Sequence, residues 1–151
     1  MQKMKIDQGD WVVVCDGKKA LILENVGDWK FPNLQTREVF EQDNPPTHEQ
    51  GSDAPGRSFQ SVGSMRSAMD QTDWHAKAEK DFLEDLAGRL DAAINAGDTT
   101  CLVMVAPPRA LGIIRQAYSQ HVRAALRGEV DKDFVKMPVH EIEQHLTGVQ
   151  G

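Results

Sequence analysis

The first part of the chain carries two short apolar runs that are typical of β-strands. They span residues 12–15 and 20–23, and Asp16 and Gly17 follow the first of them. An Asp-Gly pair between two β-prone runs favours a hairpin with a type I′ turn, because both residues tolerate the two positive φ values of that turn. Since the first run is almost entirely apolar, we expect this strand inside the sheet rather than at its edge.

After the hairpin the pattern weakens and then disappears. Residues 36–42 alternate, with Val39 and Phe40 among polar residues, and predict a third strand. From residue 43 to about residue 69 the chain carries two adjacent prolines, several Gly and Ser, and few apolar residues. This composition predicts a long exposed loop. Loops of that length inside a compact domain are usually functional or disordered, so we look for binding or catalytic residues there.

A long amphipathic helix is the clearest element of the pattern. Apolar residues recur every four positions at Trp74, Ala78, Phe82, Leu86, Leu90 and Ile94. This spacing predicts a helix over residues 73–96, with Gly97 as its C-terminal stop. Because Trp74 and Phe82 lie on the apolar stripe, we expect both in the core.

The remainder of the chain predicts a strand, a helix interrupted at Ser119, another strand and a last helix opened by Pro138. These elements span residues 101–105, 109–126, 129–135 and 138–146. The first strand is uniformly apolar, which is typical of a strand buried on both faces. A strand, helix, strand order predicts parallel strands joined by a right-handed crossover. The whole pattern predicts an α/β fold: one domain over residues 1–151, with a mixed sheet of about five strands and helices on its faces.

Composition narrows the functional classes. The chain has 151 residues, 40% apolar and 26% charged, which is typical of one globular domain with one core. Cys15 and Cys101 both lie in apolar runs, so we expect reduced, buried thiols. We see no export signal or membrane-spanning run, and therefore expect a cytoplasmic protein without a membrane partner. A net charge of −6 argues against non-specific binding to nucleic acid by the molecule as a whole.

Positive charge is nevertheless concentrated in one segment. Between Asp98 and Glu129 there is no acidic residue, whereas four arginines occur at positions 109, 115, 123 and 127. Arg109 follows a buried strand where a helix begins, a place that favours anions, although Pro107 and Pro108 remove two backbone donors there. Two interpretations stay open. Arg109 and Arg115 contribute to an anion or RNA surface, or the arginines belong to an ordinary solvated helix face.

Three stretches together resemble one family. They are Gly56-Arg57-Ser58-Phe59 with Ser61-Val62-Gly63, Leu102-Val103-Met104-Val105-Ala106-Pro107-Pro108-Arg109 with Leu111-Gly112, and Val130-Asp131-Lys132-Asp133-Phe134 with Pro138 and Glu141-Ile142. Over nearly the whole chain they resemble the bacterial host-attachment proteins. That family is similar to the central domain of eukaryotic and archaeal peptide release factors. The resemblance implies a ribonuclease-H-like mixed sheet, with a long loop between the third strand and a long helix.

In release factors this loop carries a Gly-Gly-Gln tip that enters the peptidyl-transfer centre. Gln60 stands where the resemblance places the release-factor glutamine, which makes it the candidate catalytic residue, but Ser58 and Phe59 replace both glycines. Glycines let a backbone approach a ligand more closely than other residues do. Arg57 and Arg66 flank the tip as candidate binding residues for phosphate or carboxylate groups, or else pair with local acids. Phe59 is either an anchor for a partner or tucked against the body.

Three functions follow as hypotheses. The first, which we favour, is a non-catalytic binding module that contacts RNA, the ribosome or a protein through residues 56–66 and the arginine-bearing face. The second is a hydrolase acting on peptidyl-tRNA or a related ester, with Gln60 orienting water. The third is an indirect role in attachment to host cells. We expect no cofactor and no metal site, since the five histidines show no ligand spacing.

Overall fold

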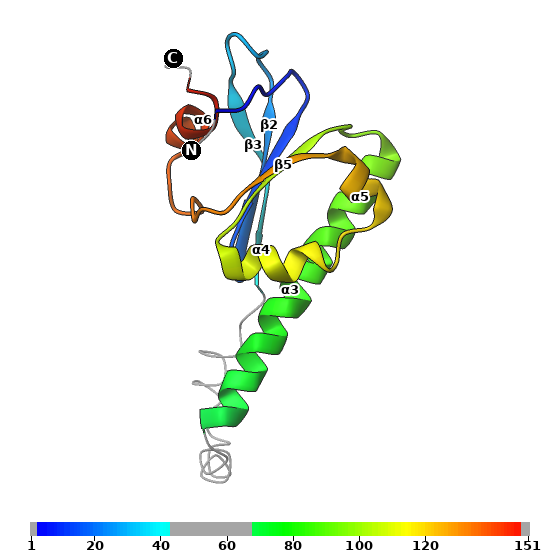
Figure 1. Ribbon diagram of the computed structural model, residues 1–151, viewed down its shortest axis with the longest axis vertical. Coiled ribbons are helices and arrows are strands. Elements are labelled where there is room, and N and C mark those ends of the chain that lie inside the picture. The colour runs from blue at the N-terminus through cyan, green and yellow to red at the C-terminus, as the bar shows by residue number, and fades with distance from the viewer. Residues whose placement is uncertain (1–2, 43–67, 149–151) are drawn as a thin grey trace.

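The computed structural model describes residues 3–42 and 68–148 of the chain (Figure 1). They form one α/β domain around an open, mixed sheet of five strands in the order β3-β2-β1-β4-β5. The strands are β1 (Trp11–Cys15), β2 (Lys19–Asn25), β3 (Leu34–Glu41), β4 (Leu102–Val105) and β5 (Leu126–Val130). β1 pairs antiparallel with β2 and parallel with β4, and lies at the centre of the sheet as predicted.

The predicted hairpin exists, but its turn is of another kind. The Asp16 amide donates to the Lys19 carbonyl over 2.9 Å, which leaves Gly17 and Lys18 at the tip. Gly17 does not have the positive φ that a type I′ turn needs, so that prediction is wrong. The Asp16 carboxylate instead accepts the backbone amides of Lys18 and Lys19, each over 2.8 Å. Gly17 packs against α3, since a Cβ there would lie 2.1 Å from an oxygen of the Glu79 side chain, which would then have to move.

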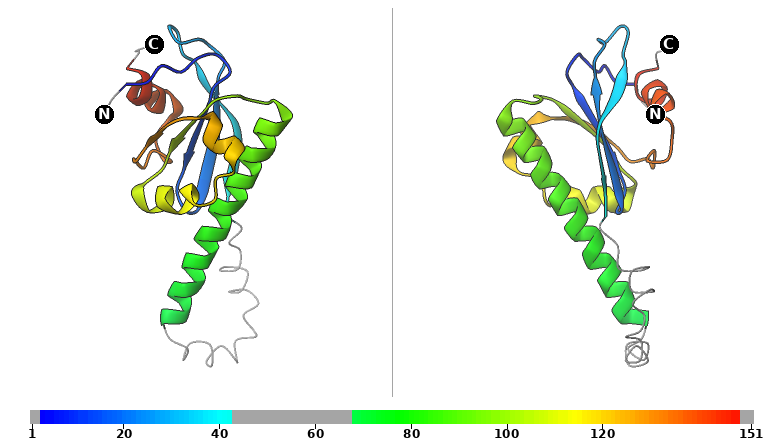
Figure 2. Two further views of the ribbon diagram at one scale, coloured as in Figure 1. Left: turned by 45° about the vertical axis from the view of Figure 1, so that its right-hand side comes forward. Right: turned by 180° about the vertical axis from the view of Figure 1, so that it is seen from behind.

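Helices cover both faces of the sheet (Figure 2). On one face lie α3 (Ala68–Ala96), α4 (Pro108–Arg115) and α5 (Gln120–Ala125), and on the other lies α6 (Val139–Thr147). Alternate residues of the central strands divide into two cores. Trp11, Val13 and Met104 pack toward the first face, whereas Val12 and Val103 pack toward α6. This alternation is why the sequence shows β1 and β4 as continuous apolar runs.

The long helix ends as predicted but begins earlier. Gly97 has a φ of 82° and terminates α3, because a glycine adopts this left-handed conformation without a steric cost. The N-terminal end lies at Ala68, five residues before the predicted start at residue 73. The N-terminal half of α3 therefore extends well past the sheet (Figures 1 and 2).

This extension overturns one prediction about the core. Trp74 continues the apolar stripe of α3 but is 50% exposed, because the sheet ends before the helix does. Phe82 lies nearer the sheet and is partly buried against the first core. Leu83, Leu86 and Leu90 are buried as expected. Only the C-terminal half of the stripe is core.

The C-terminal part of the fold follows the predicted order with one shifted strand. β4 and β5 are parallel, as the crossover pattern predicted. The helical region is interrupted at Ser119, whose hydroxyl accepts the Val122 amide over 3.1 Å and caps α5. The strand predicted at residues 129–135 instead ends at Val130. Phe134 and Val135, which suggested the longer strand, are buried from a turn that leads into α6.

Candidate functional site

The loop residues singled out from the sequence lie outside the described part of the chain. Arg57, Phe59, Gln60 and Arg66 all fall within residues 43–67, and their roles stay predictions. The structure does place the two residues that flank this segment, one on each side. Residue 42 lies where β3 ends, beside the β1–β2 turn, and Ala68 begins α3 at its outer end (Figure 1).

The β3 end of this segment is held firmly. The Gln42 amide donates to the Lys18 carbonyl over 2.7 Å, and its side chain donates to the Gly17 carbonyl over 3.2 Å. Glu79 of α3 reaches the same turn, so closely that a Cβ at position 17 would require the Glu79 side chain to move. The β1–β2 turn, the end of β3 and the middle of α3 therefore form one rigid junction.

Arg109 joins this junction through an ion pair with Glu79. Its Nε donates to Oε1 of Glu79 over 2.7 Å, although 69% of the arginine side chain remains exposed. At the start of α4, Pro107 takes the N-cap position and makes no side-chain cap hydrogen bond. The binding role predicted for Arg109 is not tested by this geometry. The fold adds the carboxylate of Glu79, which is distant in sequence and partly offsets the charge of Arg109.

The other arginines of the basic segment are also engaged. Arg115 pairs with Glu129 at 2.8 Å, and this contact raises the pKa of its guanidinium. Arg127 pairs with Asp10 at 2.9 Å and Asp7 at 3.3 Å. Arg123 donates to the Arg115 carbonyl over 3.0 Å. The sequence showed four arginines without a neighbouring acid, but the fold supplies acids to three of them. The surface is therefore far less positive than the segment alone suggested.

Three side chains with titratable S–H or O–H groups are poorly suited to nucleophilic chemistry. Burial raises the pKa of the Cys15 thiol to about 12, with a further contribution from the nearby Asp16 carboxylate. Burial likewise raises the pKa of Cys101 and of Tyr118, whose hydroxyl donates to Glu129 over 3.1 Å. Both cysteines are free thiols, as expected, but only Cys15 is buried and Cys101 is partly exposed. All three groups stay protonated near neutral pH, so none is an activated nucleophile.

Sequence reasoning missed an apolar groove beside the junction. It has a volume of about 480 Å³ and lies between the end of β3 and the N-terminal half of α3, with the aromatic rings of Phe40, Trp74 and Phe82 on its walls. Asp81 and Asp85 also line it. A periodic pattern shows that Trp74 and Phe82 share a helix face, but not where the sheet under that face ends.

Residues 10–146 match a known protein family over all five strands and the segment between β3 and α3. The chain belongs to the bacterial archaeo-eukaryotic release factor family 12. The resemblance to the release-factor scaffold is thereby confirmed. A search among curated proteins found no match to this release-factor-family protein. Attachment to host cells, the other half of the resemblance, stays a prediction.

Two negative observations apply to residues 3–42 and 68–148 of this family 12 protein. Within those ranges no helix is both long enough and apolar enough to span a membrane. Nor does the same part of the chain bring three or more His, Cys, Asp or Glu side chains together as ligands for a metal ion.

Proposed function

We propose that this protein is a non-catalytic binding module of the translation apparatus that contacts ribosomal RNA. The binding element is the segment between β3 and α3, with Arg57 and Arg66 toward phosphates and Phe59 as an apolar anchor. Arg109 and Arg115 add contacts on the body, and the protein acts in the cytoplasm. The observation that carries the proposal is the match to a release-factor family, over a range that includes this segment.

The architecture of the described part supports this proposal. α3 begins far outside the sheet, so the chain re-enters the described fold at a point well separated from the body (Figure 2). The Gln42 contacts and the Glu79 junction hold the opposite end in a defined position. A folded body with a projecting helix suits a protein that reaches into a partner, because the described body need not be ordered on binding.

Ribosome co-sedimentation tests the proposal directly. The protein should travel with ribosomes in a sucrose gradient at low salt and dissociate as salt rises, because phosphate contacts release counterions. The double variant Arg57→Ala/Arg66→Ala should weaken the association and lower the salt slope by about one to two units. The matched control Lys80→Ala/Lys136→Ala removes equal charge elsewhere and should behave as wild type. No enrichment with ribosomes, or abundant protein on the outer cell surface, would contradict the proposal.

The hydrolase hypothesis has its own observation in Gln60, which stands at the release-factor glutamine position. A positioned amide can orient a water toward an ester, but this tip lacks the two glycines that would permit close approach. Purified wild type and Gln60→Ala should therefore show the same rate on peptidyl-tRNA, at the level of the buffer. A wild-type rate at least about tenfold above the variant would show that the module is catalytic after all.

A further inference from the structure

A second candidate surface lies at the opposite end of the sheet from the outer end of α3 (Figure 1). The turn between β2 and β3 spans residues 26–33. In it Val26 is 48% exposed, Trp29 is 49% exposed and Phe31 is 75% exposed. These are three of the five large apolar side chains that are exposed in the described part of the chain. We call residues 26–33 the aromatic turn. Such a concentration of exposed apolar groups marks an interaction site more often than single exposed residues do.

The aromatic turn is anchored from below by one buried side chain. Asn25 is fully buried, and its Nδ2 donates to the Ile6 carbonyl over 2.9 Å. Its Oδ1 accepts the amides of Gly27 and Asn33 over 3.0 and 2.8 Å. Both ends of the turn are therefore held by the same amide group. A buried asparagine whose hydrogen bonds are all used in this way fixes a loop conformation.

The tip of the aromatic turn is also constrained. The Asp28 carboxylate accepts the amides of Lys30 and Phe31 over 2.9 and 2.7 Å. A Cβ at Gly27 would lie 2.1 Å from the Phe31 carbonyl, so a glycine is required where the chain folds back. Trp29 and Phe31 are thus presented to solvent by a rigid scaffold, although neither contributes to the core. Rigid exposed aromatic rings lose little entropy on binding, which makes them effective anchors.

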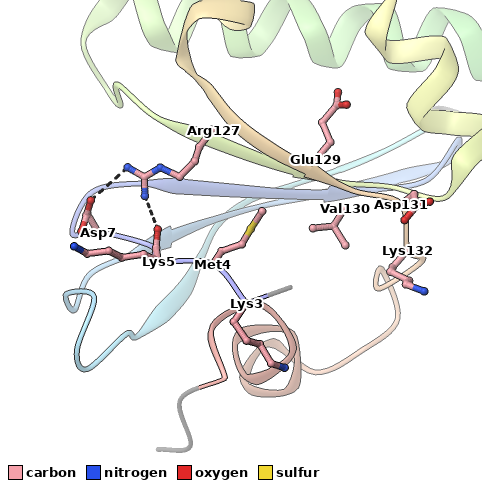
Figure 3. Close-up of a pocket in the computed structure, with 9 residues that line it drawn as sticks. All are labelled: Lys3, Met4, Lys5, Asp7, Arg127, Glu129, Val130, Asp131 and Lys132. Atoms are coloured by element: carbon pink, nitrogen blue, oxygen red, sulfur yellow. Dashed lines mark hydrogen bonds and ion pairs between the residues drawn. The ribbon is translucent and has the colours of Figure 1, made fainter. Parts of the chain in front are cut away.

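Two lysine ammonium groups lie close to the exposed Trp29 ring. Lys5 Nζ lies 4.7 Å from the centre of the Trp29 ring, and Lys30 Nζ lies 5.9 Å from it. Lys5 also lines a neighbouring pocket of about 760 Å³, together with Lys3 and Lys132 (Figure 3). Within residues 3–42 and 68–148, none of these four lysines has a carboxylate at ion-pair distance.

The pocket is also lined by three acidic residues, but two of them form ion pairs with arginines. Asp7 pairs with Arg127, as the dashed line in Figure 3 shows, and Glu129 pairs with Arg115 on another side. Asp131 remains as the one lining carboxylate without a cation at ion-pair distance in the described part of the chain. Across the pocket and the aromatic turn, the four lysines therefore outnumber the two carboxylates without an ion pair in the described residues, Asp131 and Asp28. This surface attracts anions in a molecule whose net charge is −6.

We propose that the aromatic turn and the adjoining lysine-lined pocket bind single-stranded RNA. Bases stack on Phe31 and Trp29, and Lys3, Lys5, Lys30 and Lys132 contact the phosphates. Flat apolar rings beside ammonium groups fit this ligand, because every base has a face to stack and every nucleotide has a charge to neutralise. The inference deepens the proposed function and rests on it for the class of ligand. It names a second RNA surface, remote from residue 42 and Ala68, the described ends that flank the segment between β3 and α3.

Fluorescence anisotropy with a fluorescein-labelled oligouridylate of about twelve nucleotides tests this surface. The variant Trp29→Ala/Phe31→Ala should weaken binding about tenfold or more, because each stacked base contributes strongly to affinity. The control Val39→Ala removes an apolar side chain of β3 that is 51% exposed and lies outside both proposed surfaces, and it should leave affinity unchanged. Lys5→Ala/Lys30→Ala should lower the salt slope by about one unit or more. All substituted side chains are exposed, and matching melting temperatures confirm that the fold is kept.

Four other results would overturn the inference. The wild type does not bind the oligonucleotide, or Trp29→Ala/Phe31→Ala binds as tightly as wild type. In the other two results, the variant Trp29→Ala/Phe31→Ala loses binding to phosphatidylglycerol vesicles or to a protein but keeps the RNA affinity of the wild type. Each result leaves the proposed function to be judged by ribosome co-sedimentation of Arg57→Ala/Arg66→Ala. Loss of ribosome binding in that variant, with no effect of the aromatic turn, would retain the first surface and eliminate the second.

Discussion

The two halves of α3 carry the same apolar spacing but have opposite environments. In the C-terminal half, Leu83 and Leu90 are fully buried against the sheet and α5. In the N-terminal half Trp74 is 50% exposed and borders an open groove. A helix stripe is buried only where another layer lies beneath it. The projecting half of this helix therefore has its apolar side chains available for a partner or for another part of the chain.

The largest expected effect is in the buried half. Leu90→Ala should reduce the free energy of unfolding by about 2 to 5 kcal/mol, because it removes apolar contacts and leaves a cavity. Chemical denaturation followed by circular dichroism measures this loss. A loss below about 1 kcal/mol would mean that α3 and the sheet are less tightly packed than the structure indicates.

A smaller loss of folding stability is expected for a substitution at the boundary between the two halves of α3. Gly17→Ala places a methyl group against Glu79, whose side chain Arg109 holds at 2.7 Å. We expect a loss of about 1 to 2 kcal/mol, a typical cost for overpacking. In a Glu79→Ala background, the same glycine substitution should cost much less. Equal costs in both backgrounds, measured as a double-mutant cycle, would show that Glu79 does not constrain the turn.

A modest pH dependence is expected where the buried half contacts α5. Asp91 accepts hydrogen bonds from Ser119 over 2.6 Å and from His121 over 3.1 Å, and these contacts lower its pKa. A carboxyl with a lowered folded-state pKa stabilises the fold above its unfolded pKa of roughly 4, and this contribution is lost as pH falls through the folded value. Melting temperatures of wild type and Asp91→Asn should therefore differ at pH 6 and converge toward pH 3. A constant difference would argue against this linkage.

The smallest expected effect is in the projecting half. Trp74→Ala should change the free energy of unfolding by no more than about 0.5 kcal/mol, since half of the side chain is already in solvent. A loss comparable to that of Leu90→Ala would mean that the groove is filled in solution and that the two halves are alike.

Much of the fold could be predicted from local patterns. The apolar runs identified β1 and β4 as interior strands, the four-residue spacing identified α3, and Ser119 marked the interruption between α4 and α5. The ends of elements were predicted wrongly where contacts with residues distant in sequence decided them. Phe134 and Val135 suggested a strand because they are apolar, but they are buried from a turn.

The candidate sites likewise divide into those that the sequence indicated and those that only the structure showed. Only the resemblance directed attention to Gln60 and the arginines beside it, and the composition of residues 43–69 supported a functional loop. The aromatic turn left little signal in the sequence, because Trp29 and Phe31 do not stand in a periodic pattern and their exposure depends on Asn25 beneath them. The charge of the arginine segment was counted correctly, yet its neutralisation could not be foreseen.

The sequence by itself determined the order and type of most elements, because strand and helix periods arise from neighbouring residues. Only the tertiary structure decided which apolar residues are buried and which arginines are paired. Glu79 lies thirty residues from Arg109 and still pairs with it, while Trp74 lies on the same stripe as Leu90 and is half exposed. Burial and charge pairing depend on what the fold brings alongside a side chain, and a local pattern does not contain that information.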